Sequence, residues 1–186
     1  MNSKINEDIE KILLDSSEIE KITDTLAKKI SNDYQDKNLL LICILKGSVI
    51  FTADLMRKLD IPCRIEFMQA SSYKDSTTPS AHIEIVKDIS CPLDDFDVLI
   101  VEDIVDTGNT LSYLKKYLKD KGAKSVEICA LLWKKIKEER KISVKYIGVE
   151  VSDDFVVGYG LDFAERYRAL PYIGVLKPQL YNNKEV

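Results

Sequence analysis

Three carboxylates lie within five positions in the stretch 98–111, at Glu102, Asp103 and Asp106. They follow a run of branched apolar residues, and Thr-Gly-Asn-Thr at 107–110 comes directly after them. Carboxylates accept hydrogen bonds from sugar hydroxyls, ligate Mg²⁺ or take up a proton. Small and hydroxyl residues at a helix start leave backbone N–H groups free, and the helix dipole favours an anion there. The stretch therefore predicts a site for a phosphorylated sugar.

Other polar residues also follow apolar runs of the chain. Lys46 and Gly47, Lys134 and the segment 155–162 all come after strand-like stretches. In open α/β sheets, ligands bind outside the carboxyl ends of the strands. We therefore expect these residues to meet the segment 102–110 at one edge of a sheet.

Hydrophobic spacing indicates the elements that must position these residues. Continuous apolar runs at 39–45 and 98–101 are typical of strands buried on both faces. Apolar residues at helical spacing follow each run, and an N-terminal helix is predicted to start at a capping box of Ser17 and Glu20. Strands alternating with helices predict an α/β fold, with a central parallel β-sheet flanked by helices. Further strands are expected at 61–68, 83–86, 125–133 and 144–149, and a helix at 110–121 that ends at Gly122.

The segment 70–81 differs from its surroundings because it contains almost no aliphatic residues. It joins two predicted strands, and we expect it to be a mobile surface loop. A loop of this length inside a compact domain is usually functional, often as a lid. The alternative is a hairpin tip without a role. The single histidine, His82, is expected to be a loop residue.

The composition, with 45% hydrophobic and 31% charged residues, is that of one globular domain spanning 1–186. The net charge of −4 argues against nucleic acid as the main partner, but it permits a small anionic substrate. No apolar run approaches the roughly 18 residues of a membrane span, and the polar N-terminus has no signal-peptide pattern. The four cysteines are widely spaced without a CxxC, which predicts free thiols in a cytoplasmic protein.

The stretch 98–110 resembles the phosphoribosyl-diphosphate motif of type I phosphoribosyltransferases. Within that family, the Glu102–Asp103 pair followed by Asp106 is similar to the 6-oxopurine branch, the hypoxanthine-guanine phosphoribosyltransferases. The resemblance implies a Rossmann-like type I fold. It also implies a flexible loop at 70–82 and a small hood built from the N-terminal segment and residues 150–186. The other stretches that carry the resemblance are Leu45-Lys46-Gly47, Ser72-Tyr73, Leu131 to Lys134, Phe155 to Asp162, and Arg168.

This resemblance implies a purine salvage reaction with Mg²⁺ as cofactor. 5-Phosphoribosyl 1-diphosphate and hypoxanthine or guanine would give IMP or GMP and pyrophosphate. Asp106 is the implied general base at purine N7. Glu102 and Asp103 would bind the ribose hydroxyls directly or through the metal. Residues implied to hold the 5′-phosphate are Thr107, Gly108, Asn109 and Thr110.

The same resemblance assigns the remaining site residues. Lys134 would donate to the purine 6-oxo group, which selects an oxo over an amino substituent. Phe155 would stack on the base, and the peptide between Leu45 and Lys46 is implied to be cis. The full assignment is Lys46, Gly47 and Arg168 for pyrophosphate; Lys134, Phe155, Val156 and Asp162 for the purine; Glu102, Asp103 and Asp162 for metal; and Ser72 and Tyr73 for a lid.

Simpler interpretations stay open for several of these residues. Lys134 belongs to a basic run that could be solvated, Phe155 could be core, and Arg168 could form a surface ion pair. Asp154 and Trp133 stand where the family usually has lysine and, in many bacterial members, aspartate. These departures leave the preference among hypoxanthine, guanine and xanthine open.

Other classes of function are also considered. A non-catalytic nucleotide-sensing regulator could use the same fold, although one that binds nucleic acid would be expected to add a basic face. A P-loop kinase requires GxxxxGK[ST], which the chain lacks. Asp106 and Lys134 argue against an adenine or pyrimidine phosphoribosyltransferase. The resemblance further implies a homodimer or homotetramer, with no nucleic-acid or membrane partner.

Overall fold

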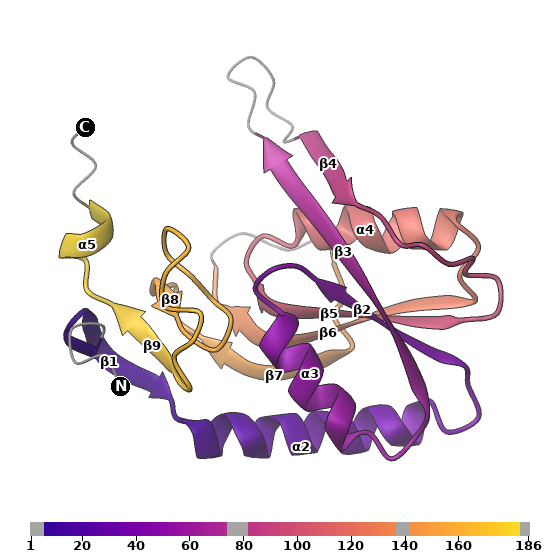
Figure 1. Cartoon of the computed structure of the whole chain (residues 1–186), viewed down its shortest axis with the longest axis horizontal. Helices are drawn as coiled ribbons and strands as arrows, with labels where there is room; N and C mark the ends of the chain where they lie inside the picture. Colours follow the sequence, from indigo (N-terminus) through magenta and orange to yellow (C-terminus); the bar gives the residue numbers. More distant parts are fainter. Residues whose placement is uncertain (1–5, 74–81, 137–141, 183–186) are drawn as a thin grey trace.

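The computed structural model describes residues 6–73, 82–136 and 142–182. Its centre is a six-stranded sheet with the order β4-β3-β2-β5-β6-β7 (Figure 1). The neighbouring strands β3, β2, β5, β6 and β7 pair in parallel. The edge strand β4 is antiparallel to β3. This confirms the predicted α/β class. The strands are β2 (Leu39–Ile44), β3 (Cys63–Tyr73), β4 (His82–Lys87), β5 (Asp97–Val105), β6 (Ser125–Lys134) and β7 (Tyr146–Val151).

Helices cover both faces of this sheet because its central strands bury side chains on each side. Leu41 and Leu99 belong to a core shared with α2 and α3, whereas Leu40 and Val98 belong to a second core shared with α4. Figure 1 shows α2 and α3 on one side of the sheet and α4 on the other. This confirms the prediction that the continuous apolar runs are strands buried on both faces. The helices are α2 (Ser16–Asp33), α3 (Val49–Lys58) and α4 (Asn109–Asp120).

The start of α2 differs from the prediction of a capping box at Ser17. Asp15 is the N-cap: its Oδ1 accepts from the Glu18 N–H at 2.9 Å, and Glu18 Oε2 accepts from the Asp15 N–H at 2.9 Å. Leu14 before the cap and Ile19 after it are both buried in the same core. This pair has the spacing of a hydrophobic staple, which favours the earlier start.

The predicted helix at 110–121 is α4, which begins one residue earlier. Its end is as expected, because Gly122 has φ of +101° and its N–H donates to the Lys119 carbonyl at 3.0 Å. Predicted strand 144–149 is shifted by two residues in the structure, where β7 begins at Tyr146.

A second, three-stranded sheet has the order β1-β9-β8 and is antiparallel. It joins a segment near the N-terminus to two segments beyond residue 155, and Figure 1 shows it at the end of the molecule far from β4. None of its three strands was predicted. Most side chains of β1 are exposed or half-buried and its sequence lacks clear alternation, and β8 and β9 are short. The elements are β1 (Ile9–Leu14), β8 (Val156–Val157), β9 (Ile173–Leu176) and the short helix α5 (Gln179–Asn182).

Strands β3 and β4 reach further toward each other than the sequence suggested. Residues 70–73 and His82, predicted as loop, are strand, and Tyr73 pairs with His82. The antiparallel pairing supplies backbone hydrogen bonds that do not depend on side-chain hydrophobicity. The hydrophobic pattern of the sequence therefore does not predict a polar strand of this kind. The rest of the predicted loop, 74–81, lies outside the described residues, and so does 137–141 of the basic run.

The four cysteines are free, as expected. Cys43 and Cys129 are buried, and Cys63 and Cys91 are half-buried. Among the described residues, no helix combines the length and the apolar character needed to cross a bilayer.

Candidate active site

The turn between β5 and α4 encloses a cavity of about 140 Å³, lined by residues 104–111 and Glu102. Gly108 precedes the helix with φ of +78°, and a Cβ there would meet Ile142 Cγ2 at 2.5 Å, so glycine is required on both grounds. The N-cap residue is glycine and supplies no side-chain cap, and backbone N–H groups in the first turn of a helix are suited to bind an anion. Asp106 lines the same cavity and is exposed. The turn therefore suits an anion, with a carboxylate beside it.

Glu102 and Asp103, near the end of β5, carry carboxylates whose charge is disfavoured by their surroundings. Burial, and then the neighbouring Asp103, raise the pKa of Glu102 well above its ordinary value. Burial raises the pKa of Asp103 to about 6, although the Ile104 N–H donates to its Oδ1 at 2.9 Å. Glu102 Oε2 is buried and has no hydrogen-bond partner within the described part of the chain. Such a pair is suited to a cation or to hydroxyl donors from a ligand.

The loop after β2 packs directly against these carboxylates. The peptide between Leu45 and Lys46 is cis, as the resemblance implies. A side chain on Gly47 would collide with the Asp103 carboxylate, and one on Gly160 would collide with the Gly47 carbonyl. Three segments distant in sequence, around residues 46, 103 and 160, are therefore in close contact. The backbone at Gly47 packs against the Asp103 carboxylate on one side and against the backbone at Gly160 on the other.

Charged side chains join the β2 loop to the segment 158–168. Lys46 Nζ lies 3.1 Å from Glu165 Oε2. Arg168 forms an ion pair with Asp162 at 2.8 Å and donates through Nη1 to the Gly160 carbonyl at 2.7 Å. Both the lysine and the arginine contact Glu165, whose pKa is lowered chiefly by its hydrogen bond with Lys46. The two cations could both reach one polyanionic group placed between the loops.

Lys134 and Phe155 each have a defined neighbour in the structure. Lys134 ends β6, and its Nζ lies 2.9 Å from Asp153 Oδ1. Phe155 meets Phe163 edge to face at a centroid distance of 5.5 Å and is stacked with Tyr181 of α5 at 4.9 Å. An aromatic side chain is suited to stack on a flat heterocycle, and a lysine is suited to donate to an oxygen acceptor.

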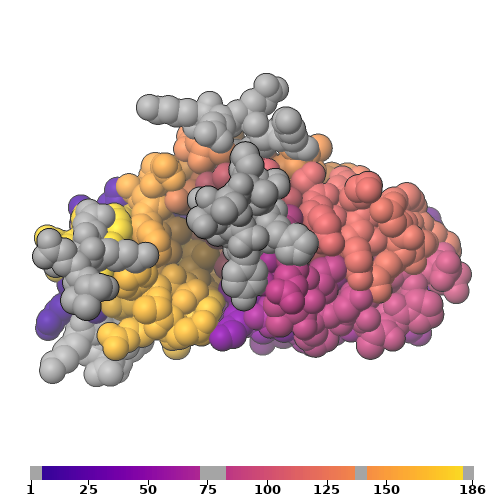
Figure 2. All heavy atoms as spheres, turned by 90° about the horizontal axis from the view of Figure 1, so that it is seen from above, coloured from indigo at the N-terminus to yellow at the C-terminus, as the bar shows by residue number. Residues whose placement is uncertain are grey.

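The remaining predicted residues are only partly placed. Val156 is buried in β8. Ser72 and Tyr73 belong to strand β3, where the structure describes their backbone but not their side chains. Figure 2 shows residues of the second sheet and its flanking loops (orange to yellow) on one side of the molecule, and those around β4 and α4 on the other. The candidate site draws on both parts.

Comparison with known proteins identifies the family. The phosphoribosyl transferase domain model matches residues 10–164. The chain belongs to the phosphoribosyltransferase family. It is 46% identical over 176 residues to a hypoxanthine-guanine phosphoribosyltransferase of Bacillus subtilis, covering 95% of this chain and 98% of that protein.

Two further phosphoribosyltransferase relatives extend this likeness. A hypoxanthine phosphoribosyltransferase structure from Staphylococcus aureus superposes with a TM-score of 0.93 at 42% identity, covering 98% of this chain and 100% of that one. A bifunctional TilS/HprT protein of Listeria monocytogenes is 41% identical over 181 residues, 97% of this chain; the chain spans only 28% of that protein's length.

The carboxylates of this phosphoribosyltransferase fit Mg²⁺. Mg²⁺ is usually held by one or two carboxylates, together with waters and substrate oxygens. Glu102 and Asp103 provide two, and the unpartnered Oε2 of Glu102 is an oxygen that a cation would satisfy. The described residues contain no cluster of three or more metal-ligating side chains, so a metal here would need oxygens from the substrate or from water. Asp162 is engaged by Arg168, and its other oxygen accepts from the Glu165 N–H at 2.9 Å.

Three residues of this phosphoribosyltransferase site were missed by sequence reasoning. Glu165 pairs with Lys46 across 119 positions, Asp153 pairs with Lys134, and Tyr181 stacks on Phe155. Glu165 and Asp153 are ordinary loop carboxylates by sequence, so no signal could have found them. Tyr181 was detectable in principle as an aromatic residue in a polar C-terminal tail.

Proposed function

We propose that this chain is a hypoxanthine-guanine phosphoribosyltransferase of purine salvage. It would convert 5-phosphoribosyl 1-diphosphate and hypoxanthine or guanine to IMP or GMP and pyrophosphate. The observation that carries this proposal is the meeting of the anion-binding turn and the Glu102–Asp103 pair with the Lys46–Gly47 loop. The names of the similar proteins support the choice of a 6-oxopurine as acceptor.

The phosphate and ribose would be held by the β5–α4 turn. Thr107, Gly108, Asn109 and Thr110 surround the cavity at the start of α4 and would bind the 5′-phosphate through backbone N–H and hydroxyl groups. Glu102 and Asp103 would accept hydrogen bonds from the ribose hydroxyls, or they would hold Mg²⁺, which coordinates the hydroxyl oxygens. When bound, Mg²⁺ would neutralise charge that develops on the departing diphosphate.

Asp106 would act as the general base. Purine N9 attacks C1′ of the ribose while the bond from C1′ to the diphosphate oxygen breaks, and the electron pair leaves with pyrophosphate. Asp106 takes the proton from N7, so the product is a neutral base in a new N-glycosidic bond. A general base of this kind typically contributes about 10²–10⁴-fold to the rate.

The other residues would bind the leaving pyrophosphate and the incoming purine. Lys46, Gly47 and Arg168 would bind pyrophosphate, with Asp162 as a ligand for a second Mg²⁺. Lys134 would donate to the purine 6-oxo group, the Val156 backbone would read the edge of the base, and Phe155 would stack on it. Ser72 and Tyr73 would belong to a lid that excludes water during the transfer.

A four-base assay tests the proposal. With Mg²⁺ and 5-phosphoribosyl 1-diphosphate, the protein should form nucleotide from hypoxanthine and guanine and much less from adenine, because Lys134 would face an amino donor there. Product formation is followed by separation of nucleotides, with xanthine as the fourth base. Xanthine as the preferred substrate would correct the base assignment. Absence of product with all four bases, with binding of nucleotide retained, would favour a nucleotide-sensing regulator instead.

The setting of the reaction is part of the proposal. Four free cysteines support a reducing compartment, and we place the protein in the cytoplasm. By its resemblance to the family, we propose a homodimer or homotetramer, to be checked by light scattering in solution.

A further inference from the structure

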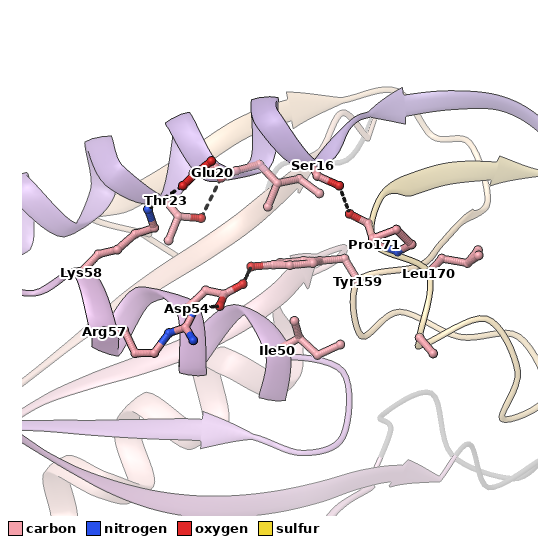
Figure 3. A pocket seen from close by; sticks show the side chains of 12 residues that line it. Ser16, Glu20, Thr23, Ile50, Asp54, Arg57, Lys58, Tyr159, Leu170 and Pro171 are labelled. Atoms are coloured by element: carbon pink, nitrogen blue, oxygen red, sulfur yellow. Dashed lines mark hydrogen bonds and ion pairs between the residues drawn. The ribbon is translucent and has the colours of Figure 1, made fainter. Parts of the chain in front are cut away.

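A cavity of about 470 Å³ lies between α2, α3 and the segment 159–171 (Figure 3). Tyr159 projects across it from the segment and is only 7% exposed. Its hydroxyl donates to Asp54 Oδ2 on α3 at 2.6 Å. Burial, and then this hydrogen bond, raise the pKa of Tyr159 above its ordinary value, so the phenol stays a donor.

The backbone around Tyr159 is shaped to deliver this ring. Tyr159 has φ of +50° between Gly158 at +100° and Gly160 at +103°, three consecutive left-handed residues. A non-glycine residue in this region is strained, and such strain persists only where other contacts hold it. The Tyr159 N–H donates to the Leu170 carbonyl at 2.9 Å, and the Tyr159–Asp54 bond anchors the other end of the residue.

The acceptor is fixed as well. Asp54 Oδ1 accepts from Arg57 Nη2 one turn later on α3 at 2.9 Å, which leaves Oδ2 to the tyrosine. Figure 3 shows the Asp54 carboxylate between the two donors. Helix α3 begins at Val49, directly after the loop of Lys46 and Gly47. The hydrogen bond therefore connects the helix that carries this loop to the segment that carries Gly160 and Asp162.

We propose that the Tyr159–Asp54 hydrogen bond positions the two walls of the diphosphate site relative to each other. On one wall are Lys46 and Gly47, and on the other are Asp162 and Arg168. Gly160 touches Gly47 without room for a Cβ, so a small displacement of α3 changes the separation of the walls. Tyr159 acts through these residues and is a positioning residue. The inference rests on the proposed function, because it takes the diphosphate as the ligand between the walls.

A purely structural role is the competing explanation, and the chain contains a matched pair to test it. Tyr146 is 4% exposed and donates to Asp33 Oδ2 at 2.7 Å, on β7 and the end of α2. Its phenol has the same chemistry and similar burial, but the pair contacts neither wall of the site. Removal of either hydroxyl should lower the free energy of unfolding by a similar amount, because each substitution removes one hydrogen bond from a buried phenol to a carboxylate.

The experiment compares Tyr159→Phe with Tyr146→Phe in steady-state kinetics. Tyr159→Phe should raise the KM for 5-phosphoribosyl 1-diphosphate about tenfold and change the KM for hypoxanthine less than about twofold, because a hydrogen bond to a charged group is lost on the diphosphate side only. Tyr146→Phe should leave both KM values unchanged. Equal behaviour of the two variants, or equal shifts in both KM values of Tyr159→Phe, would overturn the proposal.

Variants of the acceptor keep the test independent of any loss of folding. Asp54→Asn retains an oxygen that accepts from the phenol and should stay within about threefold of the parent protein. Asp54→Ala should reproduce Tyr159→Phe, and the double variant should be no worse than either single one, because both remove the same bond. Additive effects, or an Asp54→Asn variant as impaired as Asp54→Ala, would contradict a role for the hydrogen bond.

Failure of the proposed function can be recognised separately. Lys46→Ala should raise the KM for 5-phosphoribosyl 1-diphosphate if the β2 loop binds the diphosphate at all. An unchanged KM for Lys46→Ala would refute that assignment of the loop. If instead Lys46→Ala is impaired and Tyr159→Phe behaves like Tyr146→Phe, the site assignment stands and the positioning role of Tyr159 is refuted.

Discussion

At the scale of single residues, the proposed chemistry depends on carboxylates whose environments differ within one turn of chain. Glu102 and Asp103 are held where burial opposes their charge, and both have a raised pKa. Asp106, three residues later, is exposed on the turn. Under the proposed function, the first two would meet a cation or hydroxyl donors, and Asp106 would meet the base.

Asp106→Asn should separate catalysis from binding. Asparagine keeps the size and polarity of the side chain but cannot take the N7 proton, so kcat should fall about 10²–10⁴-fold. The KM for 5-phosphoribosyl 1-diphosphate should change much less, because the phosphate turn keeps its backbone donors. Steady-state kinetics with hypoxanthine measure both quantities. Equal losses in kcat and in substrate binding would show that Asp106 is a structural residue.

Asp103→Asn should stabilise the protein above pH 6 while it impairs activity. The pKa of Asp103 is raised to about 6, so the folded state holds its proton more tightly than the unfolded chain. Its contribution to the free energy of unfolding is full below the ordinary aspartate pKa near 3.9 and is lost as the pH rises through about 6. A neutral asparagine removes this loss.

The melting temperature gives the measurement for Asp103→Asn. In buffer with a chelator at pH 7.5, the variant should melt roughly 2–6 °C above the parent, and the difference should shrink toward pH 4. A melting difference that is the same at both pH values would contradict the buried, raised-pKa state of Asp103.

At the scale of elements, close approaches of the backbone shape the candidate site. The β2 loop and the β5–α4 turn are a few residues long, the segment 158–168 is longer, and each contains a glycine (at 47, 108 and 160) where a Cβ would collide with a neighbour. The C-terminal helix α5 adds a contact from an unexpected direction, because Tyr181 covers one side of Phe155. An aromatic ring held in this way keeps the orientation that stacking on a base requires.

Tyr181→Ala should weaken binding of the purine. Loss of the stacked ring frees Phe155 to change rotamer, and aromatic pairs of this kind contribute about 0.5–1.5 kcal/mol, so the KM for hypoxanthine should rise roughly 2–10-fold. The KM for 5-phosphoribosyl 1-diphosphate should not change. Tyr181→Phe retains the ring and is the matched control. An unaffected KM for hypoxanthine in Tyr181→Ala would show that α5 does not support the base site.

At the scale of the whole molecule, the site lies where two sheets meet. The parallel sheet supplies strand ends at Lys46, Glu102 and Lys134, as the rule for ligand sites in α/β sheets predicts. The second sheet, with β1 and β9 from opposite ends of the chain, carries β8 and with it Phe155 and the segment that follows. Under the proposed function the two parts would hold opposite sides of the substrate, so a contact that joins them, such as Tyr159 to Asp54, would affect substrate binding without touching the substrate.

The sequence by itself determined the α/β class, the doubly buried strands and the position of the glycine turn between β5 and α4. These follow from hydrophobic spacing and from residue types within a few positions of one another, which is local information. Only the tertiary structure decided that β1 is a strand, that Asp15 begins α2, and which charges pair. Lys46 with Glu165, Lys134 with Asp153 and the raised pKa of Asp103 depend on segments far apart in the chain, because burial and electrostatic fields are properties of the packed molecule.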